Sequence, residues 1–427
     1  MKQIIKKIIP SFLLDWYHFL LAFLGAMVYG FPSKKLKIIG VTGTNGKSTV
    51  IEMISGILEE AGFRVAALSS IKFKIADKEK MNMLKMTMPG RFVLHRFLRQ
   101  AVVEKCNYVV LEVTSEGIKQ HRHRFINFDT AVFTNLTPEH IESHGSFEKY
   151  REAKEKLFKV TKNIHVLNID DENVGHFKKY RAKKKYVYGL IADNVQLTDD
   201  ALYKLQAVNC KADASSTTFD INNTFFRLKL IGAFNIYNAL AAISIGLSQG
   251  ISLEICKKAL EQIEKIPGRM EMIISSPFNV IVDYALTPNA LEKVYKTVRN
   301  NFNPKKLICV LGACGGGRDK WKRPVLGKLA ARYCESVIVT NEDPYDESPM
   351  EIINQLAKGT EGKAKKILDR RAAIGEALKQ AEPNDLVVIT GKGCEPWICV
   401  EKGKKIPWDD RKIVKEEFEK LNYDPKK

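Results

Sequence analysis

One glycine-rich loop constrains the fold of this chain more than any other feature of the sequence. Leu36 to Val41 is a short apolar run that predicts a buried strand, and Val50 to Ala61 has the apolar periodicity of a helix. Between them lies the sequence Gly43-Thr44-Asn45-Gly46-Lys47-Ser48-Thr49. A strand, a glycine loop and a helix in this order form the phosphate-binding unit of many nucleotide-binding α/β proteins.

The loop residues have the chemistry that a triphosphate needs. Gly43 and Gly46 let backbone amides turn toward phosphate oxygens. Lys47 can reach the β and γ phosphates, and Ser48 can hold magnesium. The spacing differs from a strict Walker A motif, since Val41 stands where the first glycine belongs. An ordinary glycine turn before a helix is the alternative interpretation, but the lysine and serine directly after Gly46 favour an ATP site.

Polar side chains follow the next apolar runs. Glu112 comes directly after the run from Tyr108 to Leu111, and His140 follows the run from Thr130 to Thr134. Because carboxyl ends of parallel strands meet at one edge of a sheet, both side chains are expected near the phosphate loop. There they could hold a second magnesium. Each residue alone would more often be an ordinary surface or capping residue.

A helix is expected from Ser146 to Phe158, with Ser146 as its N-cap. Lys154 lies on this helix beside its apolar face, where a lysine is normally a solvated charge. Near two magnesium ions an ammonium group would be repelled. A lysine made neutral by that environment could instead take up carbon dioxide and become an anionic carbamate.

A second series of strands and helices follows a predicted domain boundary. The segment from Glu264 to Arg269 contains a proline and a glycine that end a helix and turn the chain. Apolar runs then recur at Asn279 to Val282, Leu307 to Leu311, Val337 to Val339 and Leu386 to Ile389. We therefore expect an α/β protein with a P-loop parallel-sheet ATPase domain at 34–265 and a Rossmann-like α/β C-terminal domain at 266–427. Short alternating segments between 186 and 230, with an Asn-Asn turn, indicate an antiparallel patch beside the first sheet.

Composition narrows the class of protein. The chain has 427 residues, 45% of them hydrophobic, so each expected domain can have its own core. The formal net charge is +19, but the lysines are spread along the chain, with only short clusters at 183–185 and 363–366. Nucleic acid is therefore not expected as a partner. Eight cysteines without paired or metal-ligand spacing predict reduced thiols, as in the cytoplasm.

Residues 1–33 form an apolar N-terminal segment. The stretch from Ile8 to Phe31 is mostly apolar, and lysines lie on both sides of it. Three interpretations stay open: a helix docked on the folded body, an interfacial helix with peripheral membrane contact, and a true membrane span. The polar Asp15 and the pair Trp16 and Tyr17 favour the first two.

Several segments resemble the motifs of the Mur ligase family, in the family's order and at its intervals, from about Lys34 to Arg411. They are Gly43 to Thr49, Glu112 to Ser115, Asn135 to His140, Glu152 to Lys154, Leu230 to Asn235 and Asp283 to Ala285. Two further segments, Cys314 to Pro324 and Gly391 to Glu395, resemble the MurE branch, which adds a diamino acid or lysine to UDP-N-acetylmuramoyl-dipeptide. Many motifs in order are far more specific than one glycine loop.

The resemblance implies roles for individual residues. Those that would bind ATP are Gly43, Thr44, Asn45, Gly46, Lys47, Ser48, Thr49, Asn235, Arg269, Asp283 and Arg318. The catalytic residues would be Lys47, Glu112, His140 and Lys154, and magnesium would be held by Ser48, Glu112, His140 and Lys154 as a carbamate. The substrates would contact Thr87, Thr114, Ser115, Asp343, Pro344, Gly391 and Glu395.

The implied reaction is ADP-forming amide synthesis with ATP and Mg²⁺, in the formation of peptidoglycan precursors. The carboxylate of a nucleotide-sugar peptide attacks the γ phosphate, the acyl phosphate meets an amino acid, and a tetrahedral intermediate collapses to amide and phosphate. We further expect a monomer in the cytoplasm, with membrane contact through residues 8–31 if the helix is interfacial. Two alternatives stay open: a ligase with another acceptor, such as a folylpolyglutamate synthase-like or other cell-envelope enzyme, and a non-catalytic nucleotide-binding protein.

Three features depart from the family pattern. An apolar segment stands where MurE-type enzymes have a UDP-binding domain. Glu342-Asp343-Pro344-Tyr345 stands where diaminopimelate-specific members have Asp-Asn-Pro-Arg, so Tyr345 replaces the arginine that would pair with the distal carboxylate of diaminopimelate. Leu286 occupies a position where the family usually has histidine. The sequence therefore leaves both the added amino acid and the acceptor open.

Overall fold

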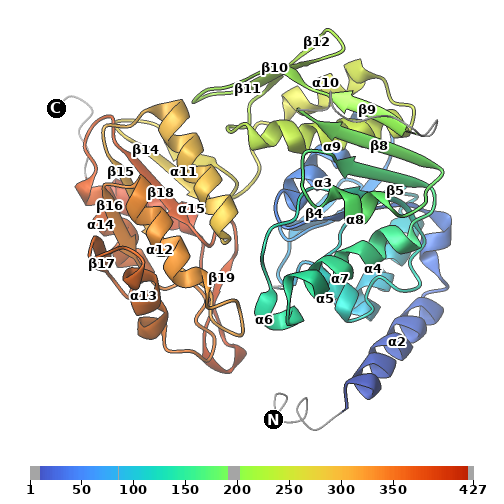
Figure 1. Ribbon diagram of the computed structural model, residues 1–427, viewed down its shortest axis with the longest axis horizontal. Helices are drawn as coiled ribbons and strands as arrows, with labels where there is room; N and C mark the ends of the chain where they lie inside the picture. The colour runs from blue at the N-terminus through green and yellow to red at the C-terminus, as the bar shows by residue number, and fades with distance from the viewer. Residues whose placement is uncertain (1–9, 85, 191–201, 422–427) are drawn as a thin grey trace.

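The protein is described by a computed structural model that covers residues 10–84, 86–190 and 202–421. Figure 1 shows two α/β bodies side by side, one drawn from blue to yellow-green and the other in orange and red. The expected fold class, a P-loop parallel-sheet domain followed by a Rossmann-like α/β domain, is confirmed. The parts of the expected segments that fall on 1–9, 191–201 and 422–427 lie outside the described residues.

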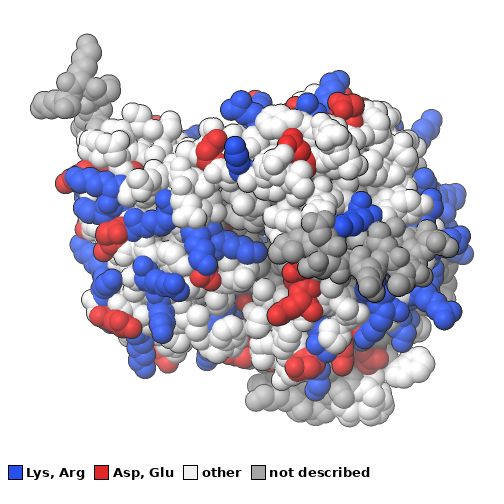
Figure 2. All heavy atoms as spheres, turned by 45° about the horizontal axis from the view of Figure 1, so that its top comes forward, with Lys and Arg blue, Asp and Glu red and all other residues white. Residues whose placement is uncertain are grey.

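On the face that Figure 2 shows, charged side chains are spread out rather than gathered in one region. Figure 2 shows Lys and Arg side chains spread across the visible face, with Asp and Glu side chains between them. A nucleic-acid-binding surface normally concentrates basic residues on one face or along one helix. The visible face does not have that pattern.

The first body is built on a mostly parallel sheet. Within the described residues this sheet has nine strands in the order β4-β3-β2-β5-β1-β6-β7-β8-β9. Their bounds are β1 Lys37–Thr42, β2 Val65–Leu68, β3 Lys72–Ile75, β4 Lys78–Met81, β5 Tyr108–Glu112, β6 Phe128–Phe133, β7 Ile164–Asn168, β8 Lys184–Gly189 and β9 Leu202–Gln206. Strand β3 pairs antiparallel with both β2 and β4, and the other neighbours pair parallel. The carboxyl ends of β5, β1 and β6 therefore lie at one edge.

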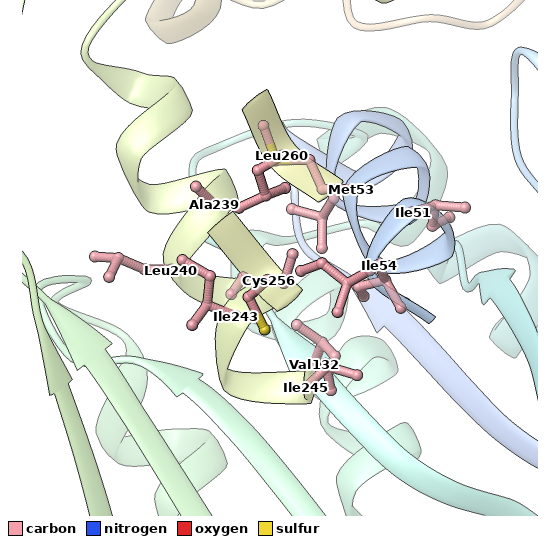
Figure 3. Close-up of a cluster of buried hydrophobic side chains, with 14 of the residues drawn as sticks. Ile51, Met53, Ile54, Val132, Ala239, Leu240, Ile243, Ile245, Cys256 and Leu260 are labelled. Carbon is pink, nitrogen blue, oxygen red and sulfur yellow. The ribbon is translucent and has the colours of Figure 1, made fainter. Parts of the chain in front are cut away.

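Helices cover both faces of this sheet. They are α3 Lys47–Glu60, α4 Arg91–Val103, α5 Ser115–Lys119, α6 Ile141–His144, α7 Phe147–Val160, α8 Val174–Lys178, α9 Phe234–Ser248 and α10 Leu253–Gln262. Because successive side chains of a strand point to opposite faces, Ile39 and Val41 enter the core with α3 and α9, while Ile38 enters the core with α4 and α7. The first of these cores surrounds Met53 and Ile54 of α3 (Figure 3). Each such fully buried side chain contributes roughly 1.5–3 kcal/mol to stability.

The expected antiparallel patch is a three-stranded sheet of β10 Val208–Ala212, β11 Thr217–Ile221 and β12 Thr224–Leu228. Strands β11 and β12 are joined by Asn222 and Asn223, whose φ angles are 46° and 63°. A two-residue hairpin turn of this kind needs two left-handed residues, which asparagine tolerates. The turn that the sequence predicts is thus confirmed.

The second body carries a sheet in the order β13-β14-β18-β15-β16-β17. Its strands are β13 Glu271–Ile274, β14 Asn279–Asp283, β15 Leu307–Leu311, β16 Ser336–Val339, β17 Ala364–Lys366 and β18 Leu386–Thr390. The helices around it are α11 Pro288–Phe302, α12 Lys322–Tyr333, α13 Pro349–Lys358, α14 Arg370–Gln380 and α15 Asp410–Glu419. A small ribbon follows, formed by β19 Trp397–Cys399, the short helix η3 Glu401–Gly403 and β20 Lys405–Pro407. Only β13 is antiparallel to its neighbour, so the other five strands end at the same edge.

The N-terminal segment forms the helix α2 Ser11–Val28 and the single turn η1 Pro32–Lys35. Helix α2 contacts α4 at the margin of the first body (Figure 1). In the part of the chain that the structure describes, no helix is long and apolar enough to cross a membrane.

Candidate active site

The phosphate loop connects β1 to α3, and its two glycines have positions that no larger residue fits. Gly43 has φ 150° and Gly46 has φ 84°. A Cβ atom on Gly43 would lie 1.9 Å from Thr134 Oγ1, and one on Gly46 would lie 2.5 Å from Asn238 Oδ1. The backbone can therefore make this sharp approach to the sheet edge only with glycine.

Asn135, at the end of β6, holds the loop in shape. Its Nδ2 donates a hydrogen bond to the Asn45 carbonyl oxygen at 3.0 Å, and its Oδ1 accepts one from Asn45 N at 3.0 Å. The Thr44 amide also donates to the Asn135 carbonyl oxygen at 2.8 Å. These contacts arrange the loop before any nucleotide binds.

A cavity of about 560 Å³ lies over the loop and is lined by both bodies. The sequence-predicted residues that line it are Gly43, Thr44, Asn45, Gly46, Lys47, Ser48, Thr49, Thr87, Glu112, Thr114, Ser115, His140, Lys154, Asn235, Arg269, Asp283 and Arg318. Asp343, Pro344, Gly391 and Glu395 are not among its lining residues. The structure thus brings the expected ATP and catalytic residues together and sets part of the expected amino-acid site apart from them.

Glu112 is the centre of a group of oxygen atoms at the start of α3. Its Oε2 accepts hydrogen bonds from Ser48 Oγ at 2.9 Å and from Ser70 N at 2.8 Å. The hydroxyls of Ser48 and Ser70 lie 2.8 Å apart, and Lys47 Nζ is 3.8 Å from Glu112 Oε1. A carboxylate and two hydroxyls are hard oxygen ligands of the kind that Mg²⁺ prefers.

Lys154 reaches the same place from α7. Its buried Nζ donates to the Gly43 carbonyl oxygen at 2.7 Å and lies 4.7 Å from the centre of the Tyr150 ring. Burial, and then the nearby charge of Lys47, hold the pKa of Lys154 well below its usual value. This lysine favours the neutral amine more than an ordinary surface lysine does.

His140 lies where the two bodies meet. Its Nδ1 is 3.5 Å from Arg318 Nη1, which comes from the second body. Burial, together with the charge of Arg318, lowers the pKa of His140 far below its usual value. The imidazole is therefore neutral, the form in which histidine binds metals.

Further contacts close the two bodies against each other. Lys322 Nζ and Glu139 Oε1 form a buried ion pair at 2.7 Å. The Glu142 amide donates to Asp319 Oδ1 at 2.9 Å, and the Lys320 amide donates to Glu142 Oε1 at 2.6 Å. The loop before α12 therefore covers the phosphate end of the cavity.

At the other end, a buried lysine joins the acidic residues of the second body. Lys392 Nζ donates to Asp343 Oδ1 at 2.9 Å and to Glu395 Oε2 at 2.6 Å. Glu395 Oε1 accepts from the hydroxyl of Tyr284 at 3.0 Å, and Tyr284 itself lines the cavity. The guanidinium of Arg269 lies 4.4 Å from the centre of the Tyr284 ring. Tyr284 thus connects the expected amino-acid site to the cavity.

The residues that depart from the family motifs have the following neighbours. Tyr345 has φ 53°, and its ring lies so close to Gly316 that a Cβ on that glycine would be 2.5 Å away. Burial and the adjacent Asp343 raise the pKa of Glu342, which accepts a hydrogen bond from Cys314 Sγ at 2.8 Å. Leu286 lines the cavity.

Two residues that were expected to bind the nucleotide also form hydrogen bonds within the protein. Asn235 Nδ2 donates to the Ile231 carbonyl oxygen at 3.0 Å. The two oxygens of Asp283 accept from the amides of Met270 and Ala285, both at 2.7 Å. Asp283 therefore fixes the turn that carries Arg269 into the cavity.

The sequence interpretation missed several residues of this site, among them Ser70, Glu139 and Tyr284. Ser70 follows β2 by two positions, so the rule that strand ends form the site could have indicated it. Glu139 and Tyr284 stood inside quoted motifs, but their partners are far away in the sequence, and spacing does not show such contacts.

Comparison with known proteins identifies the family. A model of the Mur ligase middle domain matches residues 41–246, and a model of the Mur ligase glutamate ligase domain matches residues 268–393. The chain belongs to the Mur ligase family. Within it, the chain is 38% identical over 417 residues to a UDP-N-acetylmuramoyl-L-alanyl-D-glutamate–2,6-diaminopimelate ligase of Syntrophomonas wolfei, covering 93% of this chain and 81% of the relative. A ligase of the same name from Clostridium botulinum is 37% identical over 400 residues, which cover 93% of this chain and 80% of that relative.

Solved structures agree with the MurE-type resemblance. A 2,6-diaminopimelate ligase structure superposes with a TM-score of 0.59 at 28% identity, over 91% of this chain and 79% of that one. A folylpolyglutamate synthase of Mycobacterium tuberculosis superposes with a TM-score of 0.70 at 16% identity, over 87% of this chain and 92% of that one. At so low an identity this likeness shows the fold alone. This Mur ligase is an ATP-dependent, amide-forming enzyme, as the sequence predicted.

Proposed function

We propose that this Mur ligase joins an amino acid to the carboxylate of a UDP-N-acetylmuramoyl-peptide, with ATP as the source of energy. The observation that carries the proposal is one cavity with a phosphate loop at one end and Tyr284, which reaches Glu395, at the other. Relatives that are 38% and 34% identical carry the name of such a ligase, with 2,6-diaminopimelate as the amino acid.

ATP would lie with its phosphates on the loop from Gly43 to Thr49. Asn235 would contact the adenine, and Arg269 and Arg318 would approach the nucleotide from the second body. Magnesium would be held by Ser48 and Glu112, and at a second position by Glu112, His140 and Lys154, where it would neutralise phosphate charge. The oxygen atoms grouped around Glu112 support this assignment.

Lys154 would act as a carbamate. An ammonium group beside Lys47 and a bound metal would be repelled, whereas the depressed pKa of Lys154 favours the neutral amine that reacts with carbon dioxide. The resulting carbamate would carry its negative charge on two oxygens next to Lys154 Nζ, which now contacts the Gly43 carbonyl oxygen.

In the reaction, Lys47 would neutralise the γ phosphate while the acceptor carboxylate attacks it. Thr87, Thr114 and Ser115 line the side of the cavity that would receive the acceptor. The covering loop that carries Arg318 would exclude water, which would otherwise hydrolyse the acyl phosphate. Catalysis then consists of positioning and charge neutralisation.

The amine would enter from the second body, near Asp343, Pro344, Gly391 and Glu395. The buried cluster of Asp343, Lys392 and Glu395 has more acidic than basic groups, which suits an amino group. Tyr345 offers no guanidinium to a distal carboxylate. We therefore propose that the amino acid differs from diaminopimelate, with lysine and ornithine as the first candidates.

An oxygen label tests the reaction. The acceptor carboxylate is labelled with ¹⁸O, and the released phosphate is analysed by mass spectrometry in the presence of ATP, Mg²⁺ and the amine. One labelled oxygen per phosphate is expected, because the bond between the carboxyl carbon and that oxygen breaks when the amine attacks. Unlabelled phosphate with amide formation would exclude the acyl phosphate.

We also propose that the enzyme works as a cytoplasmic monomer without nucleic acid, and that residues 8–31 give it a peripheral contact with a membrane. The interspersed basic and acidic side chains on the face shown in Figure 2 support the proposal that nucleic acid is not a partner.

A further inference from the structure

Helix α2 has an apolar face that the rest of the described protein does not cover. The large apolar side chains exposed on it are Phe12, Leu13, Trp16, Tyr17, Leu20, Phe23, Met27 and Val28, with Trp16 at 68%, Leu20 at 52% and Val28 at 64%. They recur at intervals of three and four residues, so they form one stripe along the helix. Soluble monomers rarely expose a continuous apolar patch of this kind without a partner for it.

The opposite face attaches α2 to the first body. Gly25 is buried, and a Cβ atom on it would lie 3.3 Å from His95 Cδ2 of α4. The ring of Phe19 contacts the ring of Phe125 edge-on, at 5.2 Å between centres. Phe23 lies at the border between the exposed stripe and this attached face, and its ring contacts Phe125 at 5.4 Å. The helix therefore has one face fixed to the protein and one face turned outward.

The charged residues in and beside α2 in the sequence are mostly basic. Asp15 is the only acidic residue among residues 1–51, and its Oδ1 lies 2.7 Å from His121 Nε2. Lys34, Lys35 and Lys37 follow the helix and are exposed, and three more lysines stand in the sequence before it. Lysines near an anionic lipid surface are attracted to it electrostatically. A partner for this surface should therefore be apolar and negatively charged.

We propose that the exposed stripe of α2 docks in the plane of an anionic lipid bilayer. Its apolar side chains would enter the boundary between headgroups and acyl chains, where Trp16 and Tyr17 are favoured, and the flanking lysines would contact the headgroups. The proposal rests on the peripheral contact proposed above and adds to it the face and the class of lipid. It holds whichever amino acid the ligase transfers.

Vesicle flotation with the full chain tests this docking. Wild-type protein is expected to float with vesicles of phosphatidylcholine and phosphatidylglycerol, and less with phosphatidylcholine alone. Trp16→Glu combined with Leu20→Glu puts two carboxylates into the stripe and should lower the vesicle-bound fraction about tenfold. Equal flotation of this variant, or no flotation of the wild type, would overturn the proposal.

Phe225→Glu is the matched control, because Phe225 on β12 is 51% exposed and lies outside the stripe. It should float as the wild type does. Ligase turnover without vesicles should be equal in all three proteins, which shows that the variants fold. Loss of turnover in all of them with flotation intact would instead contradict the proposed function. A wild-type dimer in light scattering that the α2 variant converts to a monomer would assign the stripe to a second copy and overturn the lipid proposal.

Discussion

The two parts of the proposed site are built on different principles. In the nucleotide part, one continuous loop that includes Gly43 and Lys47 lines the cavity, and Glu112 lies on the strand next to β1. At the amine end, Asp343, Lys392 and Glu395 follow two separate strands of the second sheet. The first end follows the family motif closely, and the second departs from it. This contrast indicates that phosphoryl transfer requires a fixed loop, whereas a change of a single side chain can alter which amine the enzyme accepts.

The largest effect is expected at the nucleotide end from Lys47→Ala. Loss of the ammonium group removes charge neutralisation at the γ phosphate and should lower turnover about 10³-fold. The rate of phosphate release with saturating substrates measures this. Turnover within tenfold of the wild type would contradict the role given to the loop.

Lys154→Ala should lower turnover about 10²-fold or more, because the site loses the proposed carbamate. Bicarbonate or a short carboxylic acid at high concentration should partly restore the rate by filling the space with an anion. Lys156→Ala is the control, since Lys156 is exposed on the same helix and should leave turnover unchanged. If Lys154→Ala turns over as fast as the wild type, the carbamate has no role.

Tyr345→Arg tests the amine end. A guanidinium at this position could pair with a distal carboxylate, so kcat/KM for diaminopimelate relative to lysine should rise about tenfold. Tyr345→Phe should leave this ratio as it is in the wild type. An unchanged ratio in Tyr345→Arg would show that the residue does not determine the choice of amine.

The smallest effect concerns the support of the loop. Asn135→Ala removes two side-chain hydrogen bonds to the backbone of Asn45. If each bond has a net value of about 0.5 kcal/mol, the lower end of the usual range, the loss of both should raise the KM for ATP about fivefold, while the KM for the amine should stay constant. An equal rise in both constants would mean that the two ends are not independent.

Local patterns predicted much of this protein. The strand, glycine loop and helix around Gly43 can be read from a few adjacent residues, and the Asn222-Asn223 hairpin depends on local backbone conformation alone. The N-cap at Ser146 is also local, and its hydroxyl accepts a hydrogen bond from Lys149 N at 3.3 Å.

The contacts between the bodies could not be predicted in this way. The pair of Glu139 and Lys322 joins residues 183 positions apart, and its partners are matched only by the folded structure. Asp283 is a second example. The motif indicated that this residue binds the nucleotide, but it did not indicate that Asp283 accepts hydrogen bonds from the backbone amides of Met270 and Ala285. Residue types and spacing give the chemistry of a side chain, while its partners depend on how the sheets come together.

Phosphate release from ATP and Mg²⁺ with UDP-N-acetylmuramoyl-L-alanyl-D-glutamate tests the central claim most directly. Lysine, ornithine, diaminopimelate and other amines are supplied one at a time, and the products are weighed by mass spectrometry. We expect phosphate release that depends on both acceptor and amine, with one new mass that equals the acceptor plus the amino acid less water. Phosphate release that no acceptor and no amine can stimulate would contradict it.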